Sequence, residues 1–463
     1  MPTEVIRDHL TKDIIGGGGE IIALGERFRD RGFKGGLVDE LRVFNRDLSA
    51  AEARELAFPG TLAALRADAG PAARAALLET YLAAHDGPVR EAAAALRTAR
   101  AALTAADEEV KEIMVMRETE RPRPAYILRR GEYDQRGDEV GPDTPAALPP
   151  FPADAPRNRL GLARWLTQPD HPLLARVTVN RFWQACFGRG LVKTPEDFGS
   201  QGDRGDHPEL LDWLAHEFVR TGWDVKELLR LIVTSHTYRQ RSFAAGPVMT
   251  EDPENALLAR GPRHRLAAEM IRDHALAASG LLVERIGGPP VFTYDLPESF
   301  KPAPAGKGED LHRRSLYTFW RRNGPAPVLE AFDTPKRVVC VVRRDTTNSP
   351  LHALVLLNGK QFVEASRVLA ERLLRTHGAD HTALLADAFA RLTGRPPDGT
   401  ERRIIARLHE EQLAWFNRNP GDADCHLEVG DTPPDRGLPP PAVAALAVTI
   451  NTLMNHDAFV VKR

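Results

Sequence analysis

Signals that start α-helices recur along most of this 463-residue chain, and they restrict its fold more than any other feature. A polar N-cap residue followed three positions later by Glu satisfies backbone N–H groups that have no partner inside the helix. The pattern occurs at Ser49, Asp206 and Asp224, while Ser349 followed by Pro350 carries the related signal of proline at the first helical position. Each signal precedes apolar residues at helical spacing, so we predict a mainly α fold: a multi-helix domain with long Pro-rich loops and few strands.

The helical pattern extends well beyond these four starts. Glycine is tolerated inside the segment that begins at Ser349, and the polar residues 418–440 are expected to form a loop. An N-cap is expected at Thr194, with acids in the first turn. Asp380 and Thr400 are expected to cap two more helices. The predicted helices, including those that follow the starts at Asp206, Asp224 and Ser349, cover residues 88–116, 177–187, 210–220, 227–238, 264–279, 349–377 and 442–455.

The N-terminal segment differs, because residues 20–46 alternate apolar and polar around GFKGG, as half-buried strands joined by a glycine turn do. It resembles the C-terminal end of a laminin-G or concanavalin-like jelly roll. The matching residues are Gly36, Val38, Asp39, Glu40, Arg42, Val43, Phe44, Asn45, Arg46, Leu48, Ser49 and Glu52. Three strands and one helix cannot bury a sheet face alone. The resemblance therefore implies an incomplete N-terminal β-sandwich remnant at residues 1–57, with Met1 inside a domain of a longer protein.

Two further segments separate this remnant from the main helical part. Residues 58–118 are rich in Ala, Leu, Arg and Glu, and we interpret them as a helical spacer. Residues 119–157 are rich in proline and suit an extended connector. The main helical domain is then expected to occupy residues 158–463.

Several motifs of that domain are long and specific. They read VNRFWQACFGRGLVKTPEDFGSQG, HPELLDWLAHEF, GWDVKELLRLIVTSHTYRQ, RHRLAAEMIRD, LHRRSLYTFWRR and RRDTTNSPLHALVLLN. Through these motifs the chain resembles the C-terminal planctomycete-specific domain of unknown function found in large exported proteins, over residues 125 to 463. The resemblance implies a periplasmic or cell-surface setting, a cytochrome-c-like domain on the same polypeptide and a possible carbohydrate partner. Haem is implied only on that other domain.

Composition and cysteine spacing exclude several classes of function. Lys and Arg total 62 and Asp and Glu total 64, so a net charge of -2 gives no reason to expect nucleic acid. No run approaches 18 apolar residues, and the N-terminus has no apolar signal-peptide core, so neither a membrane span nor a signal peptide is expected. The cysteines at 186, 340 and 425 form no disulfide framework and no C-x-x-C or C-x-x-C-H motif. No metal pattern and no cofactor site are expected in this chain.

The stretch 177–202 carries the first group of candidate site residues. Cys186 lies late in its predicted helix with no nearby histidine on its C-terminal side, so we interpret it as a packing residue rather than a nucleophile. Arg181, Asp197 and Gln201 are stronger candidates, because the family pattern fixes these polar positions. Arg181 either braces Asp197 as an ion pair or shares a polar ligand with it.

The stretch 343–350 carries the second group. Arg343, Arg344, Thr346 and Asn348 lie beside a predicted helix N-terminus, and such an arrangement can hold a sulfate, phosphate or carboxylate. The alternative is that Ser349 only caps the helix and the arginines pair with acids such as Asp333.

Two hypotheses about function follow. The first is an accessory or binding module of an exported, glycan-associated protein with cytochrome-c-like partners. The second is an enzyme acting on an extracellular polysaccharide or another anionic substrate through Arg181, Asp197 and residues 343–349. The second requires Asp197 and Arg343 to meet in a concave pocket.

Overall fold

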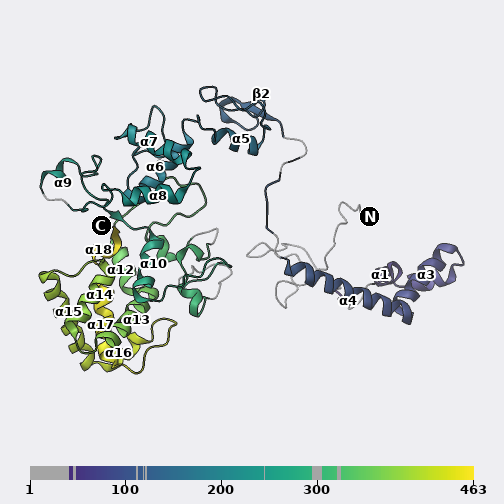
Figure 1. Ribbon diagram of the computed structural model, residues 1–463. Helices are drawn as coiled ribbons and strands as arrows, with labels where there is room; N and C mark the ends of the chain where they lie inside the picture. Colours follow the sequence, from purple (N-terminus) through teal and green to yellow (C-terminus); the bar gives the residue numbers. More distant parts are fainter. Residues whose placement is uncertain are drawn as a thin grey trace. The chain divides into compact units, whose positions relative to one another are not determined.

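The computed structural model describes residues 41–44, 48–110, 113–117, 119, 123–243, 246–294, 305–320 and 325–462. These residues are mostly helical, and their sheets are limited to two pairs of short strands, which confirms the mainly α prediction. The chain divides into two compact units, Met1–Tyr126 and Ile127–Arg463, and each is considered by itself (Figure 1). None of the helices in the described ranges has both the length and the apolar composition that a bilayer span requires.

The first unit consists of helices in its described part. They are α1 (Ala50–Ala57), α2 (Thr61–Ala67), α3 (Pro71–Ala84) and α4 (Gly87–Glu109). The capping box at α1 is confirmed: the Ser49 hydroxyl accepts the Glu52 N–H, and the Glu52 carboxylate accepts the Ser49 N–H at 2.9 Å. Helix α4 ends at Glu109 rather than near residue 116, because the acids Asp107 and Glu109 oppose the negative end of the helix dipole.

The predicted sandwich remnant falls largely outside the described residues. Residues 1–40 and 45–47, which include most of the predicted strands, are among those not described. Residues 41–44 have no regular secondary structure and are exposed. The β-sandwich remnant therefore stays a prediction.

The second unit begins with short strands and a first group of helices. Strand β1 (Ala125–Leu128) starts just before the unit boundary and pairs with β2 (Arg136–Val140), with a 3-10 turn, η1 (Arg129–Gly131), between them. The first helices are α5 (Arg159–Leu166), α6 (Leu174–Phe187), α7 (Pro208–Arg220), α8 (Val225–Thr234) and α9 (Pro247–Glu251). Helices α6, α7 and α8 share one apolar core, to which α7 contributes Leu211, Leu214 and Phe218 at helical spacing.

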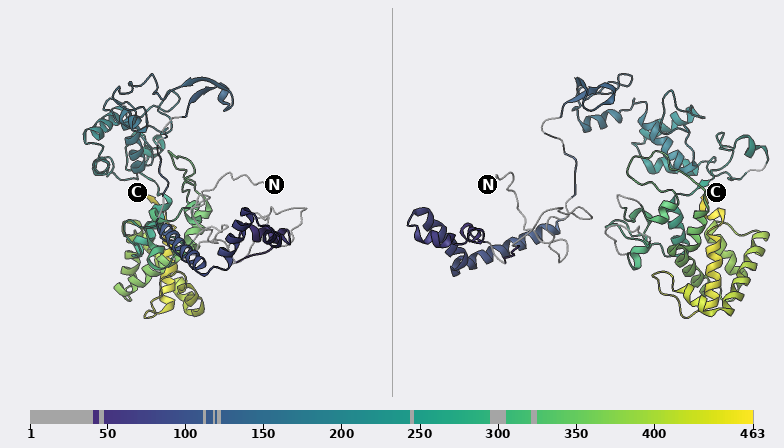
Figure 2. Two further views of the ribbon diagram at one scale, coloured as in Figure 1. Left: turned by 90° about the vertical axis from the view of Figure 1, so that its right-hand side faces the viewer. Right: turned by 180° about the vertical axis from the view of Figure 1, so that it is seen from behind.

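A larger second group of elements forms the C-terminal half. The elements are β3 (His264–Arg265), α10 (Ala268–Ser279), η2 (Gly308–His312), η3 (Ser315–Tyr317), α11 (Pro327–Ala331), α12 (Pro350–Asn358), α13 (Lys360–His377), α14 (His381–Thr393), α15 (Gly399–Arg418), α16 (Pro420–Leu427), α17 (Pro440–Leu453), α18 (Asp457–Val460) and β4 (Val461–Lys462). Helix α17 lies at the centre of this group, with α13, α15 and α16 packed against it (Figure 2).

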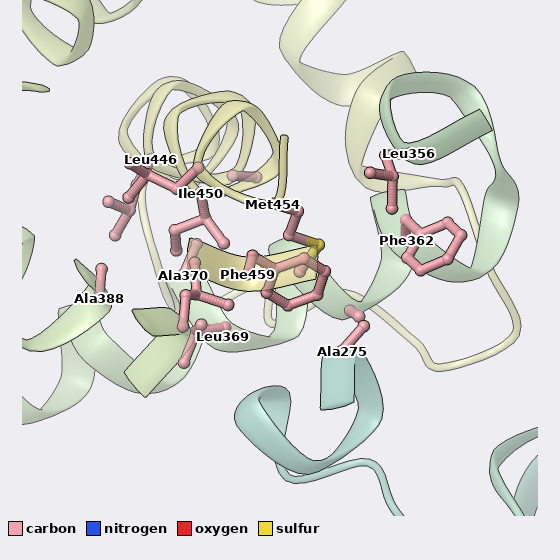
Figure 3. Packing of buried hydrophobic residues seen from close by; sticks show 14 of the residues in the cluster. Ala275, Leu356, Phe362, Leu369, Ala370, Ala388, Leu446, Ile450, Met454 and Phe459 are labelled. Carbon is pink, nitrogen blue, oxygen red and sulfur yellow. The ribbon is translucent and has the colours of Figure 1, made fainter. Parts of the chain in front are cut away.

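The core of this half explains the position of α17. Its residues 443–447 and Ile450 are fully buried, so the helix is apolar all round and must lie inside the protein. Figure 3 shows Leu369 and Ala370 of α13 close to Leu446 and Ile450 of α17. Side chains from α10, α12, α14 and α18 belong to the same cluster.

Strands β3 and β4 form the second pair of short strands. They pair antiparallel, with His264 opposite Lys462 and Arg265 opposite Val461. The helix predicted to start near residue 264 therefore begins at Ala268, because residues 264 and 265 form a strand.

Three predicted helix starts were wrong. Asp206 does not cap α7, because its carboxylate forms an ion pair with Arg189 and the helix begins at Pro208. Thr194 starts no helix, since its hydroxyl donates to the Asp197 carbonyl at 2.8 Å inside a turn. The cap of α15 is Asp398 rather than Thr400.

Two predicted boundaries also need correction. The helix expected over 349–377 is broken into α12 and α13 at Gly359, whose ψ of 123° is extended; a β-carbon there would lie 2.7 Å from the Val355 carbonyl oxygen. The loop expected at 418–440 contains α16, which starts with Pro420 and buries Ala423 and Leu427. By contrast, the Asp224 and Asp380 caps are confirmed.

Candidate functional site

Cys186 lies in α6 as a packing residue. The side chain is buried beside Trp183 and Phe187, whose rings stack with centroids 4.1 Å apart. Burial raises the pKa of the Cys186 thiol, although the charge of Lys462 opposes that shift. A buried thiol with a raised pKa is a poor nucleophile, so the structure supports the packing interpretation.

Asn180 fixes the loop after α6. Its side chain is fully buried, donates to the Val192 carbonyl at 3.0 Å and accepts the Val192 N–H at 2.9 Å. The chain approaches this amide closely, because a β-carbon on Gly190 would lie 2.7 Å from it. The amide therefore substitutes for a backbone partner and closes the turn.

The first group of candidate residues does not converge on a site. Arg181 and Gln201 are exposed. The Asp197 carboxylate accepts the Gly199 N–H at 2.7 Å and so shapes its own turn. The structure shows no ion pair between Arg181 and Asp197, so the proposed brace between them is absent from the described residues.

The two arginines of the second group pair with acids other than Asp333. Arg344 holds Glu269 with two hydrogen bonds, of 2.6 and 3.1 Å, while Arg343 lies 3.6 Å from a Glu196 carboxylate oxygen. The 194–197 turn and Arg343 thus meet, but through an exposed ion pair rather than in a pocket. Asp197 is not part of this contact.

Thr346 and Asn348 line a cavity of about 510 Å³. His264 and Arg265 of β3 form part of its wall, and His352 of α12 forms another part. The antiparallel pairing of β3 with β4 positions His264 and Arg265, and helix α12 positions His352. Its lining runs from Gly188 to Val461, so the cavity draws on segments about 270 positions apart.

Asp333 connects two walls of this cavity. Its carboxylate accepts from Arg265 at 2.6 Å, from the Thr347 N–H at 2.8 Å and from the Thr347 hydroxyl at 2.9 Å. Burial opposes ionisation, but these contacts outweigh it and hold the pKa of Asp333 below its usual range. The φ angle of 61° at Asp333 is uncommon for a residue other than glycine, which shows how strongly its surroundings fix it.

The two histidines at the cavity are kept neutral by their surroundings. His352 is buried, stacks on Phe332 with centroids 4.9 Å apart, and has a lowered pKa because of burial and the charge of Arg265. Burial and the charge of Lys462 lower the pKa of His264. Arg265 is therefore the cation of the cavity wall, and the Asp333 carboxylate pairs with it.

The N-terminus of α12 lies at the same wall, although Pro350 has no N–H and the His352 N–H donates to the Ser349 carbonyl at 3.1 Å. Ser349 occupies the N-cap position as predicted, but its side chain makes no capping hydrogen bond. The first N–H groups of a helix have no intrahelical partner and carry partial positive charge. Asp457, the carboxylate that lines the cavity, is ion-paired with Arg263 at 2.8 Å. The cavity thus offers the Arg265 guanidinium and the side chains of Thr346 and Asn348 as donors to a ligand rich in acceptor oxygens.

Sequence reasoning missed a buried polar network around Glu364 of α13. The Glu364 carboxylate is fully buried and accepts from Tyr294 at 3.0 Å and from His312 at 3.1 Å. It also accepts the N–H groups of Asp431 and Thr432, at 3.0 and 2.8 Å. The only signal in the sequence is a charged residue on the buried face of a strongly amphipathic helix. Through these four hydrogen bonds the carboxylate ties three segments outside α13 to that helix.

A second cavity of about 350 Å³ lies along α14 and α15. Apolar side chains make up much of its lining, and His381 and His409 face each other there with ring nitrogens 3.2 Å apart. None of the predicted site residues reaches it. Within the described ranges, no group of three or more His, Cys, Asp or Glu residues is arranged to hold a metal ion.

Comparison with known proteins identifies the chain by family. No curated protein and no solved structure matches it. A family model described as PSD1, protein of unknown function (DUF1553), matches residues 158–409, which is more than half of the chain. The matched region includes Arg265, Asp333 and the 346–349 segment. The chain therefore belongs to the PSD1 (DUF1553) family of proteins of unknown function.

Proposed function

We propose that this domain is a binding module that holds an anionic saccharide in the cavity around Arg265. The observation that carries the proposal is that Arg265, Thr346, Asn348 and the N-terminus of α12 converge on one cavity of about 510 Å³. A guanidinium favours a carboxylate or sulfate. Hydroxyl and amide side chains suit the hydroxyl groups of a sugar. The volume lies in the range of small-molecule sites.

The cavity supports binding better than catalysis. Its carboxylate Asp457 and the neighbouring Asp333 are both engaged with arginines. A pair of carboxylates acting as acid and base needs one group with a raised pKa, whereas the pKa of Asp333 is lowered. Arg181 and Asp197, on which an enzymatic role was to depend, do not line the cavity. No observation therefore favours the enzyme alternative.

The setting of the module is also part of the proposal. Its sequence motifs resemble a domain of exported multidomain proteins, so we place it in the periplasm or at the cell surface. A cytochrome-c-like domain on the same polypeptide would carry the haem. The support for this setting is the resemblance of the motifs alone, together with an N-terminal segment similar to a carbohydrate-binding sandwich.

A ligand panel tests the proposal directly. The full chain is heated with uronic acid oligosaccharides, sulfated oligosaccharides, neutral oligosaccharides, and inorganic sulfate. A ligand at 100 times its Kd stabilises the folded state by about 2.7 kcal/mol, which corresponds to a rise in Tm of about 5 °C for a domain of this size. An acidic oligosaccharide should produce this shift, and a neutral one should not. No shift with any compound would overturn the proposal.

Two neighbouring substitutions on α12 locate the site. Ala353 lines the cavity, whereas Leu354 is 57% exposed and is absent from the lining. Ala353→Trp fills the cavity and should abolish binding, while Leu354→Trp should leave Kd unchanged within about threefold. Binding that survives in Ala353→Trp would show that the saccharide sits elsewhere. Circular dichroism of both variants confirms that α12 remains folded.

A further inference from the structure

Helix α4 presents an apolar seam that is exposed in the first unit. Val89, Leu96 and Leu103 follow one another at intervals of seven, and their exposed fractions are 40%, 51% and 62%. Ala92 and Ala99 lie three residues after the first two, and Ala106 follows the same pattern after Leu103. Positions a and d of a heptad repeat have this spacing, and they form the contact seam of a coiled coil.

The described part of the first unit has little core of its own. Its buried apolar side chains are those of Ala51 and Ala73, while Phe58 is 71% exposed and Tyr81 is 54% exposed. Isolated helices depend on packing of their apolar faces for most of their stability in water. The seam of α4 is therefore a surface that needs a partner.

The alternation of large and small residues makes this seam complementary to itself in one orientation. In a parallel pair, each a residue faces its own equivalent, so layers of two leucines would alternate with layers of two alanines and leave gaps. In an antiparallel pair, a faces d, and every large residue meets an alanine. We infer that α4 pairs antiparallel with α4 of a second copy.

The register follows from the same alternation. Leu96 packs on Ala99 of the partner subunit, Leu103 on Ala92 of the partner subunit, and Val89 on Ala106 of the partner subunit. The two-fold axis then passes between residues 97 and 98, next to the midpoint of a helix that spans Gly87–Glu109. The helices therefore overlap along nearly their whole length. Ala93, Ala95 and Ala102 flank the seam, and such small residues permit a close approach.

The size of the seam sets the expected affinity. A helix of 23 residues is about 34 Å long, and a contact strip about 10 Å wide gives roughly 700 Å² over both helices. Interfaces of this size are weak or transient. We expect a Kd in the micromolar range and a symmetric dimer in rapid exchange with the monomer.

Sedimentation of the full chain between about 1 and 100 μM measures this equilibrium, with a dimer of twice the 51.1 kDa of one chain expected at the upper end. Ala99→Asp places a charge in the seam, and Ala101→Asp makes the same change about 200° around the helix. The first should raise Kd by at least about 100-fold, and the second by less than about threefold. A monomer at 100 μM, or equal effects of the two changes, would overturn the inference.

Disulfide cross-linking tests the orientation. The exposed Cys340 and Cys425 are first replaced by serine, and Leu96→Cys and Ala99→Cys variants are made in that background. Antiparallel pairing should join the Leu96→Cys chain to the Ala99→Cys chain when the two are mixed and oxidised. Cross-links between identical variants only would show a parallel pair and refute the register.

Discussion

Replacing Glu364 with glutamine tests whether one buried carboxylate holds several loops on the α13 helix. One carboxylate oxygen accepts the N–H groups of Asp431 and Thr432, and the other accepts from Tyr294 and His312. Glutamine keeps the shape and one acceptor oxygen, but its NH₂ group replaces the oxygen that accepts from one of the two pairs of partners. A buried hydrogen-bond partner lost in this way costs about 1–3 kcal/mol.

The pKa of Glu364 gives a second, independent magnitude. Burial opposes ionisation, but hydrogen bonds from His312 and Thr432 outweigh it and lower the pKa from 4.5 to about 2. A lowered pKa means that the folded protein binds this proton less readily than the unfolded chain does. The stabilisation is complete above pH 4.5 and is lost as the pH falls towards 2. It amounts to about 3 kcal/mol at 1.36 kcal/mol for each pKa unit.

Urea unfolding at several pH values measures both quantities. At pH 7 we expect Glu364→Gln to lower the free energy of unfolding by about 2–3 kcal/mol, which moves the midpoint by about 1 M for a slope near 3 kcal/mol/M. Between pH 4.5 and 2 the variant should lose less stability than the wild type. Glu410→Gln serves as the control, because that side chain is exposed and should change the stability by less than about 0.5 kcal/mol. An unchanged midpoint together with an unchanged pH profile would refute the reasoning.

Two further predictions concern other buried polar groups. Asn180→Ala removes both hydrogen bonds to Val192 and should lower the free energy of unfolding by about 2–3 kcal/mol. Ala185→Ser, a change at a nearby exposed position, should have little effect on the free energy of unfolding. Equal urea midpoints for the two variants would contradict the proposed role of Asn180. Burial and the charge of His381 lower the pKa of His409 to about 4, so stability should fall by about 3 kcal/mol as the pH drops from 6.5 to 4, and His409→Gln should flatten this part of the profile.

Local signals in the sequence predicted helices better than their caps. Asp224 caps α8, and its carboxylate accepts the Glu227 N–H at 3.0 Å. Asp206 has the same sequence signature, but Arg189 lies 17 residues away in the chain and takes its carboxylate. A capping pattern contains no information about such a distant ion pair. The break at Gly359 also depends on tertiary packing, since a single glycine inside a helix is usually tolerated.

The sequence indicated only some of the residues that line the cavity. Thr346 and Asn348 lie beside a helix start, and this local pattern directed attention to them. Arg265 and His352 were missed because their contacts depend on residues far along the chain, such as Asp333, which is 68 positions from Arg265. Arg181 was chosen from a pattern of polar residues, but that pattern does not distinguish an exposed side chain from one in a site.

The pairing of β3 with β4 has a consequence for the order of folding during synthesis. Arg263 and Asp457 form an ion pair across 194 positions of sequence, and Val460 and Val461 belong to the cavity wall. A ribosome adds about 5–20 residues each second, so residue 457 follows residue 263 by roughly 10–40 s. The nascent chain holds β3 unpaired during this delay. The cavity around Arg265 therefore cannot be completed until residues 457–461 have been synthesised.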